Sequence, residues 1–258
     1  METSLLKEKV LELSLMKQYP QSLYYRGDTT LLHQRKISIV GTRRPSQYTR
    51  EFTLKLSQAL SKSGFCIVSG AAMGVDAIAH KGAGSSNTIA VLANGLDIRY
   101  PAVNKHLINE IEVSGLLLST YEDKTPSLAW QFVQRNEIVV ALGEVLIVCE
   151  ADLKSGSMRS VDYALVMGKT IYVLPHRLNE SMGTNKLIDE GKAKVITDID
   201  SFVLELGGEL TIQETDLFLE YCYQNNSYDD VVKVFPEKVF EYELEGKIEV
   251  LNGKVIVL

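Results

Sequence analysis

The chain has 258 residues, of which 45% are hydrophobic and 23% charged, a composition typical of a globular protein with a full core. It shows neither a signal-peptide pattern nor an apolar run long enough to span a bilayer, so we expect a cytoplasmic protein with no membrane association. The net charge of −6 argues at first sight against a nucleic-acid partner.

That charge is unevenly distributed along the chain. Residues 209–258 carry four lysines and eleven acidic side chains, a net charge of −7, whereas residues 1–208 are close to neutral at +1. A neutral body can still carry a basic pocket.

The three cysteines, Cys66, Cys149 and Cys222, lack metal-ligand spacing, so we expect no metal site. Cys66 and Cys149 lie in apolar runs, so we expect them to be buried, reduced thiols.

The N-terminal segment, residues 1–35, predicts an amphipathic helix, a turn at Tyr19-Pro20 and a short edge strand at 23–25. From residue 36 onwards, apolar strands alternate with helical patterns. We expect strands at 37–40, 65–69, 88–92, 116–119, 145–149, 170–174 and 194–196, and helices at 49–63, 75–80, from 104, at 131–142, from 155, at 185–190 and at 199–206.

This alternation predicts parallel strands joined by right-handed crossovers. The fold class expected for residues 36–206 is therefore α/β, an extended Rossmann-like, doubly wound and mostly parallel sheet. Ligands of such sheets bind at the carboxyl ends of the strands.

A small acidic domain is expected at residues 209–258, after a linker at Gly207-Gly208. Helical patterns at 214–224, 228–235 and 237–245 precede a hairpin on Asn252-Gly253, which is the layout of a winged helix. Since each phosphate contact needs a cation, we expect this domain to contact protein or to stabilise a dimer rather than to read duplex DNA.

Two segments that follow predicted strands suit phosphate. Lys154-Ser155-Gly156-Ser157 opens a helix, whose free N–H groups and dipole attract an anion. In Gly41-Thr42-Arg43-Arg44, two guanidinium groups suit bidentate phosphate contact. The alternatives are an ordinary capped helix and solvated arginines. A further glycine loop, from Gly70 to Gly74, opens another helix.

The segment Trp130-Gln131-Phe132-Val133-Gln134-Arg135-Asn136 places two aromatic side chains beside a cation and an amide. Stacking platforms next to cations suit single-stranded nucleic acid, because every base has a face. The alternative is that Phe132 belongs to the core and that Trp130 covers the surface. The two interpretations are evenly balanced on the sequence alone.

Known catalytic and cofactor motifs are absent from the sequence. Neither a G-x-G-x-x-G dinucleotide motif nor a P-loop occurs, and the four histidines and three cysteines have no partner pattern. We therefore expect no catalytic residue and no cofactor.

Six ordered motifs resemble those of the DNA-processing protein A (DprA, Smf) family. The resemblance runs over about residues 22–206 and rests on Gly41-Thr-Arg-Arg-Pro45, Ser69 to His80, Asn94 to Asp97 with Tyr100-Pro101, Phe132-x-x-Arg135-Asn136, Lys154 to Ser157 and Ser181-x-Gly-Thr-Asn185.

This resemblance implies an extended Rossmann fold and a homodimer that binds and protects single-stranded DNA during natural transformation and helps to load the RecA recombinase. It implies that Arg43, Phe132, Arg135 and Asn136 hold the DNA, and that Lys154 to Ser157 and Gly70 to Gly74 complete the phosphate-contacting rim. The chain departs from the family at Glu137, where an arginine is usual.

An enzyme class, the lysine-decarboxylase-like phosphoribohydrolases, is the alternative. These enzymes carry P-G-G-x-G-T followed by a catalytic glutamate, whereas this chain has Lys154 to Ser157 and then Ser160 at the position of the glutamate. Without that carboxylate the nucleosidic bond has no evident acid or base. Binding without catalysis is therefore the preferred interpretation.

Overall fold

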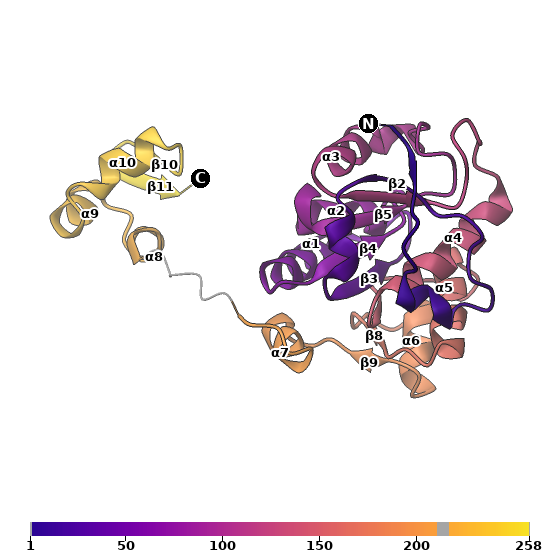
Figure 1. Ribbon diagram of the computed structural model, residues 1–258. Coiled ribbons are helices and arrows are strands. Elements are labelled where there is room, and N and C mark those ends of the chain that lie inside the picture. The colour runs from indigo at the N-terminus through magenta and orange to yellow at the C-terminus, as the bar shows by residue number, and fades with distance from the viewer. Residues whose placement is uncertain (1, 211–216, 258) are drawn as a thin grey trace. The chain divides into compact units, whose positions relative to one another are not determined.

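One sheet organises the first part of the chain, and it has nine strands within residues 2–210 and 217–257, which the structure, a computed structural model, describes (Figure 1). The strands are β1 (Ser4–Leu5), β2 (Tyr24–Gly27), β3 (Lys36–Val40), β4 (Cys66–Ser69), β5 (Thr88–Val91), β6 (Leu116–Ser119), β7 (Leu146–Val148), β8 (Ile171–Val173) and β9 (Lys194–Val195).

The strand order is β1-β2-β6-β5-β4-β3-β7-β8-β9, with β3 to β9 parallel and β1 and β2 antiparallel. From β3 the chain builds the sheet in one direction through β4 to β6, and then in the other through β7 to β9. The topological switch point, where ligands of such sheets bind, therefore lies between β3 and β7. The predicted doubly wound, mostly parallel α/β fold is confirmed.

Helices cover both faces of the sheet, which explains why the central strands are apolar at nearly every position. One face packs against α4 (Ala129–Leu142), α5 (Gly156–Val166) and α6 (Met182–Asp189). The other face packs against α1 (Gln47–Lys62), α2 (Val75–Ala83), α3 (Lys105–Ser114) and α7 (Ile199–Glu205).

Helix α1 illustrates how local sequence sets these elements. The Ser46 hydroxyl accepts the N–H of Thr49 and caps the first turn. Leu56 and Leu60, one turn apart, are fully buried, and each stabilises the fold by roughly 1.5–3 kcal/mol relative to an exposed side chain. Gly64, at φ +86°, then turns the chain into β4.

The prediction of an amphipathic helix within residues 1–35 is wrong. Ser4 and Leu5 instead pair with β2, and the short 3₁₀ helix η1 (Leu11–Leu15) follows. The Tyr19 hydroxyl accepts the N–H of Val10, and Leu13 is fully buried in the core that contains α4. The segment lacks a side-chain cap, and the free edge of β2 offers its main chain better partners than an isolated helix would.

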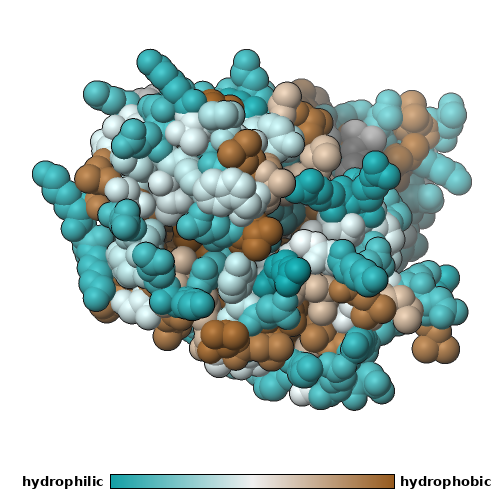
Figure 2. Space-filling model, turned by 90° about the vertical axis from the view of Figure 1, so that its right-hand side faces the viewer, coloured by the Kyte–Doolittle hydropathy of each residue, from teal (hydrophilic) through white to brown (hydrophobic). Residues whose placement is uncertain are grey.

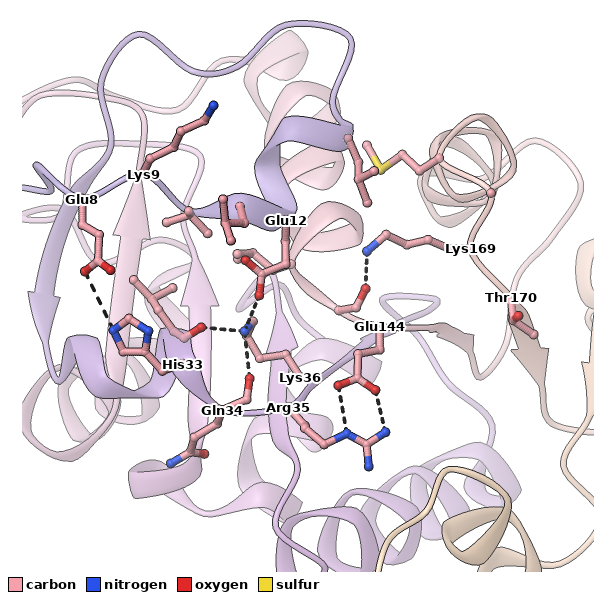
Figure 3. Close-up of a pocket in the computed structure, with 18 residues that line it drawn as sticks. Glu8, Lys9, Glu12, His33, Gln34, Arg35, Lys36, Glu144, Lys169 and Thr170 are labelled. Atoms are coloured by element: carbon pink, nitrogen blue, oxygen red, sulfur yellow. Dashed lines mark hydrogen bonds and ion pairs between the residues drawn. The ribbon is translucent and has the colours of Figure 1, made fainter.

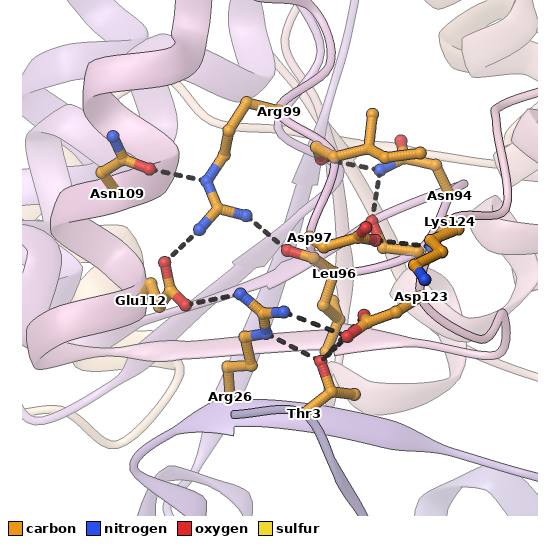
Figure 4. Close-up of polar contacts among 12 residues, drawn as sticks. Thr3, Arg26, Asn94, Leu96, Asp97, Arg99, Asn109, Glu112, Asp123 and Lys124 are labelled. Atoms are coloured by element: carbon orange, nitrogen blue, oxygen red, sulfur yellow. Dashed lines mark hydrogen bonds and ion pairs between the residues drawn. The ribbon is translucent and has the colours of Figure 1, made fainter. Parts of the chain in front are cut away.

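Ion pairs tie this segment to α3 and to the loop after β6 (Figure 4). The Arg26 guanidinium in β2 lies 2.9 Å from the Glu112 carboxylate in α3 and 3.2 Å from Asp123, and its Nε donates to the Thr3 hydroxyl. Arg99 contacts the second oxygen of Glu112. Residues 1–35 therefore form part of the first unit.

The chain divides into two compact units after Leu210. A Cβ on Gly208 would lie 2.7 Å from the Phe65 ring, so the predicted linker packs against the first unit. Within the described residues, the second unit contains α8 (Leu217–Gln224), α9 (Tyr228–Val234), α10 (Lys238–Leu244) and the hairpin of β10 (Ile248–Leu251) and β11 (Lys254–Val257). Residues 214–216 of the first predicted helix lie outside the described residues.

A separate core holds the second unit together, with Phe218 packed edge-on against the rings of Phe235 and Tyr242. Asn252 and Gly253 both have positive φ, as the predicted two-residue hairpin turn requires. Three helices followed by a hairpin match the expected winged-helix layout. Cys66 and Cys149 are buried free thiols, as predicted, and Cys222 is buried as well. Within the described residues, no helix has both the length and the apolar character needed to cross a membrane.

Candidate nucleic-acid interface

A pocket of about 430 Å³ lies at the switch point of the sheet. The loops after β3 and β7 and the first two turns of α4 form its walls, so segments far apart in the sequence meet here. Most of the predicted site residues line it: Gly41, Thr42, Arg43, Phe132, Arg135, Asn136, Ser155, Gly156 and Ser157. Gly70 lines an adjoining hollow that shares Arg43, Phe132 and Arg135.

The amino terminus of α5 forms one wall of the pocket. Ser155 precedes the helix in an extended conformation, and its side chain does not cap the first turn. The hydroxyls of Ser155 and Ser160 are buried without a hydrogen-bond partner in the described part of the chain. A Cβ on Gly156 would meet open space. The first-turn N–H groups, the helix dipole and unpartnered hydroxyls together form a site suited to an anion.

Arg43 and Phe132 form the opposite wall. Arg43 is exposed and makes no ion pair among the described residues, and its guanidinium carbon lies 5.6 Å from the centroid of the half-buried Phe132 ring. The Tyr100 ring lies 5.7 Å from Phe132 at 47°. A cation beside two aromatic rings can hold a phosphate and stack a base.

Tyr100 was not predicted as a site residue. It is 45% exposed and lies in the loop after β5, beside the cis Tyr100-Pro101 bond. An aromatic side chain that follows a third strand end in an α/β fold could have indicated its role.

Arg135 lies beneath the pocket rather than in its mouth. The side chain is 4% exposed, and one terminal nitrogen donates to the carbonyl oxygens of Gly70 and Val91, the latter at 2.7 Å. Its Nε donates to the Asn136 side-chain oxygen at 3.1 Å. Arg135 adds positive charge to the pocket, but these N–H groups are engaged inside the protein.

The loop from Gly70 to Ala72 is closed by side chains of the helix that follows it. The Asp76 carboxylate accepts the N–H groups of Gly70 and Ala72 at 3.2 and 3.4 Å, and the His80 Nε2 accepts that of Ala71 at 3.3 Å. Burial raises the pKa of the Asp76 carboxyl, and the nearby charge of Arg135 opposes that rise. These three N–H groups are therefore not free to bind phosphate.

The carbonyl groups of the same loop are also engaged. The Asn104 side-chain amide donates to the oxygens of Ala71 and Ala72, each at 3.0 Å, and Arg135 donates to that of Gly70. The main chain from Gly70 to Ala72 thus lacks the free N–H groups with which the loop would contact phosphate in the way that the family resemblance implies.

His80 is neutral in this arrangement. The Thr88 hydroxyl donates to the Ile67 carbonyl, so it can only accept from the His80 Nδ1 at 2.7 Å, which leaves Nε2 as the acceptor for the loop. Burial, supported by the positive charge of Arg135, lowers the pKa of His80 to about 3.

Besides Gly70, which lines the adjoining hollow, four predicted residues do not line the pocket: Arg44, Gly74, Trp130 and Lys154. Arg44 and Lys154 are exposed beside it. Gly74 has φ +79°, and a Cβ there would lie 2.4 Å from the Thr42 carbonyl oxygen, so its role is packing. Trp130 lies on another side of α4.

A larger hollow, of about 780 Å³, lies at the amino ends of the parallel strands (Figure 3). Three of its cations are already engaged by protein groups. Lys36 Nζ donates to two main-chain carbonyls and pairs with Glu12 at 2.7 Å, Lys169 donates to carbonyls at the end of α4, and Arg35 pairs with Glu144. Lys9 is exposed and makes no ion pair among the described residues, but the carboxylates of Glu8, Glu12 and Glu144 also line this hollow. The hollow therefore suits a nucleic-acid backbone less well than the pocket at the switch point does.

Figure 2 shows one face of the molecule, on which hydrophilic side chains predominate and hydrophobic ones form separate small patches. Such a surface is ordinary for a protein of this composition.

Comparison with known proteins gives consistent matches. A family model described as DNA recombination-mediator protein A matches residues 7–207. The Smf protein of Synechocystis is 39% identical over 198 residues, which cover 73% of this chain and 49% of the relative. DprA of Bacillus subtilis is 35% identical over 204 residues, covering 77% of this chain and 68% of the relative.

The solved structures that match the fold include two DNA processing proteins. A structure of DNA processing protein A from Helicobacter pylori, described for its single-stranded DNA binding mode, superposes with a TM-score of 0.78 and 43% identity over 80% of this chain and 95% of the other. DprA from Streptococcus pneumoniae gives a TM-score of 0.73 and 33% identity over 79% and 73% of the two chains. The chain spans about half the length of the Synechocystis relative.

Proposed function

Because the chain belongs to the DNA recombination-mediator protein A family, we propose that it binds single-stranded DNA in the pocket between β3 and β7. A backbone phosphate lies at the start of α5, over the buried hydroxyls of Ser155 and Ser160, with Arg43 as its counter-ion. A base stacks on Phe132 beside Tyr100. Arg135 supplies charge from below without touching the DNA.

The observation that carries this proposal is the free cation beside free anion-binding groups. Arg43 lies over Phe132 with no ion pair among the described residues, and it lines the same pocket as the uncapped start of α5. Bases and phosphates occur together only in nucleotides and nucleic acids. The pocket is lined by loops from several strand ends, so it suits a chain better than a single nucleotide.

Binding without cleavage fits this chemistry. Asp76 is the one carboxylate that lines the pocket within the described residues, and its oxygen already accepts two loop N–H groups. Ser160, at the position of the phosphoribohydrolase glutamate, cannot act as an acid or base at neutral pH.

The test is a binding titration of oligo(dT) and the matching duplex at two salt concentrations. We expect tighter binding of the single strand and an affinity that falls as salt rises. Arg43→Ala should weaken binding uniformly across sequences, and Phe132→Ala should cost about 1–3 kcal/mol through lost stacking. Lys192→Ala, which removes a cation just before β9 at the amino edge, is the control and should bind as the parent does.

Equal affinity for duplex, or parental binding by both pocket variants, would contradict the proposal. Release of free base from a nucleotide would favour the enzyme alternative instead.

We infer from family membership that the protein acts in the cytoplasm as a homodimer that protects incoming single strands in natural transformation and helps RecA to load on them. We expect the acidic second unit to contact a partner protein or to stabilise the dimer. Sedimentation of the intact chain tests the dimer. The rate of RecA filament growth on DNA precoated by a single-strand binding protein tests the loading.

A further inference from the structure

A second groove, of about 550 Å³, lies on the other side of α4 from the pocket. Thr120, Tyr121 and Glu122 follow the carboxyl end of β6, so the groove opens at the same rim of the sheet as the pocket does. Trp130 forms its α4 wall and is 58% exposed. An exposed tryptophan at a ligand-binding rim calls for an explanation, because burying an indole is strongly favourable.

The aromatic side chains of this groove are held in place. The rings of Trp130 and Tyr121 meet edge to face with centroids 6.1 Å apart, and Trp130 keeps more than half of its surface exposed. The Tyr121 hydroxyl donates to the Gln134 side chain at 2.8 Å, one turn further along α4. A fixed, exposed aromatic platform of this kind costs little entropy when a flat ligand stacks on it.

The charge of the groove suits a base better than a phosphate. Its lining has one cation, Lys17, and two carboxylates, which are hydrogen-bonded: Glu122 accepts from the Tyr24 hydroxyl, and Glu137 accepts from the Lys17 main-chain N–H. A phosphate in the groove would be repelled, whereas an uncharged base would not.

The groove and the pocket share α4. Trp130 and Phe132 are two positions apart, which places them about 200° apart around the helix. Val133 and Asn136 continue on the pocket side, while Gln134 and Glu137 continue on the groove side. An α-helix with its side chains is about 10–12 Å wide, so a single strand that binds in the pocket has to cross this width before a later base can reach the groove.

We propose that the groove beside Trp130 is a second base-stacking site, which receives a base of the same single strand after it crosses the start of α4. This inference rests on the single-strand binding proposed above. The cationic pocket holds phosphate and one base, and Trp130 and Tyr121 hold a later base while the backbone stays outside the acidic groove.

Trp130 is the single tryptophan of the chain, so its fluorescence reports directly on the groove. The experiment titrates the intact protein with oligo(dT) of about 4 and about 16 nucleotides, the range of site sizes of single-strand binding modules. The short oligonucleotide should bind the pocket and leave the emission nearly unchanged. The long one should quench it.

Variants separate the two sites. Trp130→Ala should weaken binding of the long oligonucleotide about fivefold or more, with the same salt dependence as the parent and with unchanged affinity for the short one. Phe132→Ala should weaken both. Tyr223→Ala, which removes another exposed aromatic ring in the second unit, should change neither.

Unchanged Trp130 emission on binding of the long oligonucleotide, or parental affinity of Trp130→Ala for it, would overturn the second site and leave the groove to another partner, such as a proline-rich peptide. Those results leave binding in the pocket intact. Failure of the short oligonucleotide to bind at all would instead refute the proposed function.

Discussion

Two of the glycine-containing segments at the carboxyl ends of the strands look alike in the sequence and differ in chemistry. The start of α5, at Ser155 and Gly156, leaves its hydroxyl and first-turn N–H groups without side-chain caps. In the loop from Gly70 to Ala72, all three N–H groups and all three carbonyls are hydrogen-bonded to buried side chains. The first can bind a ligand, and the second supports the pocket in which the ligand lies.

The difference teaches that a glycine-rich loop is not by itself a phosphate site. What decides its role is whether the protein already satisfies its donors. Arg43 and Arg135 repeat the contrast, because one guanidinium is exposed and unpaired among the described residues while the other is buried and hydrogen-bonded. Each pair can be tested by matched substitutions.

The largest effect is expected from Arg135→Met. The substitution leaves the carbonyls of Gly70 and Val91 without this donor and removes the charge that offsets Asp76, so we expect unfolding to become easier by about 3–5 kcal/mol. Urea denaturation measures the change. Arg43→Met, the matched control, should stay within about 0.5 kcal/mol of the parent and lose DNA binding instead. The contrast fails if Arg43→Met is the less stable of the two.

His80 should make stability depend on pH. Its pKa is about 3 when folded and about 6.5 when unfolded, so between these values the unfolded chain binds the extra proton. The contribution of His80 to the free energy of unfolding is therefore fully present above pH 6.5. As pH decreases toward 3, this contribution falls by about 1.4 kcal/mol per pH unit. Urea denaturation of the parent and of His80→Gln, compared from pH 7 to pH 5, isolates the pH dependence that His80 contributes. Parallel pH profiles would show that His80 does not close the loop as a neutral acceptor.

The two kinds of glycine should respond in opposite ways to alanine. Gly74→Ala places a Cβ against the Thr42 carbonyl at positive φ and should destabilise the fold by roughly 1–3 kcal/mol. Gly156→Ala meets open space in a helical position and should be neutral or stabilising by about 0.4–1 kcal/mol. It should still weaken single-strand binding, because the methyl group stands where the phosphate approaches the helix. Thermal unfolding and an oligo(dT) titration test both variants, and full binding by Gly156→Ala would count against this wall of the pocket.

The smallest effect is expected from ending the chain after Leu210. All residues that line the pocket lie in the first unit, and the second unit is acidic and has its own core. We expect oligo(dT) affinity to change by less than about threefold, a free-energy change of under ~0.7 kcal/mol. A large loss would show that the second unit takes part in DNA binding.

The sequence by itself determined the fold class, because apolar strands that alternate with helices have few ways to bury both faces of a sheet. It also identified the segments at the carboxyl rim, since parallel strands bring their ends to one edge. The hairpin at Asn252-Gly253 followed from local turn chemistry alone.

Only the tertiary structure decided which of these groups are free. Burial of Arg135, closure of the Gly70 loop by Asp76, His80 and Asn104, and the separation of Trp130 from Phe132 around α4 all depend on contacts between distant segments. The prediction of a helix near the N-terminus was wrong for the same reason: Ser4 and Leu5 pair with β2, and no local sequence pattern reveals that partner. The sequence specifies which hydrogen-bonding groups the chain contains, but the folded structure determines which of these groups bind one another.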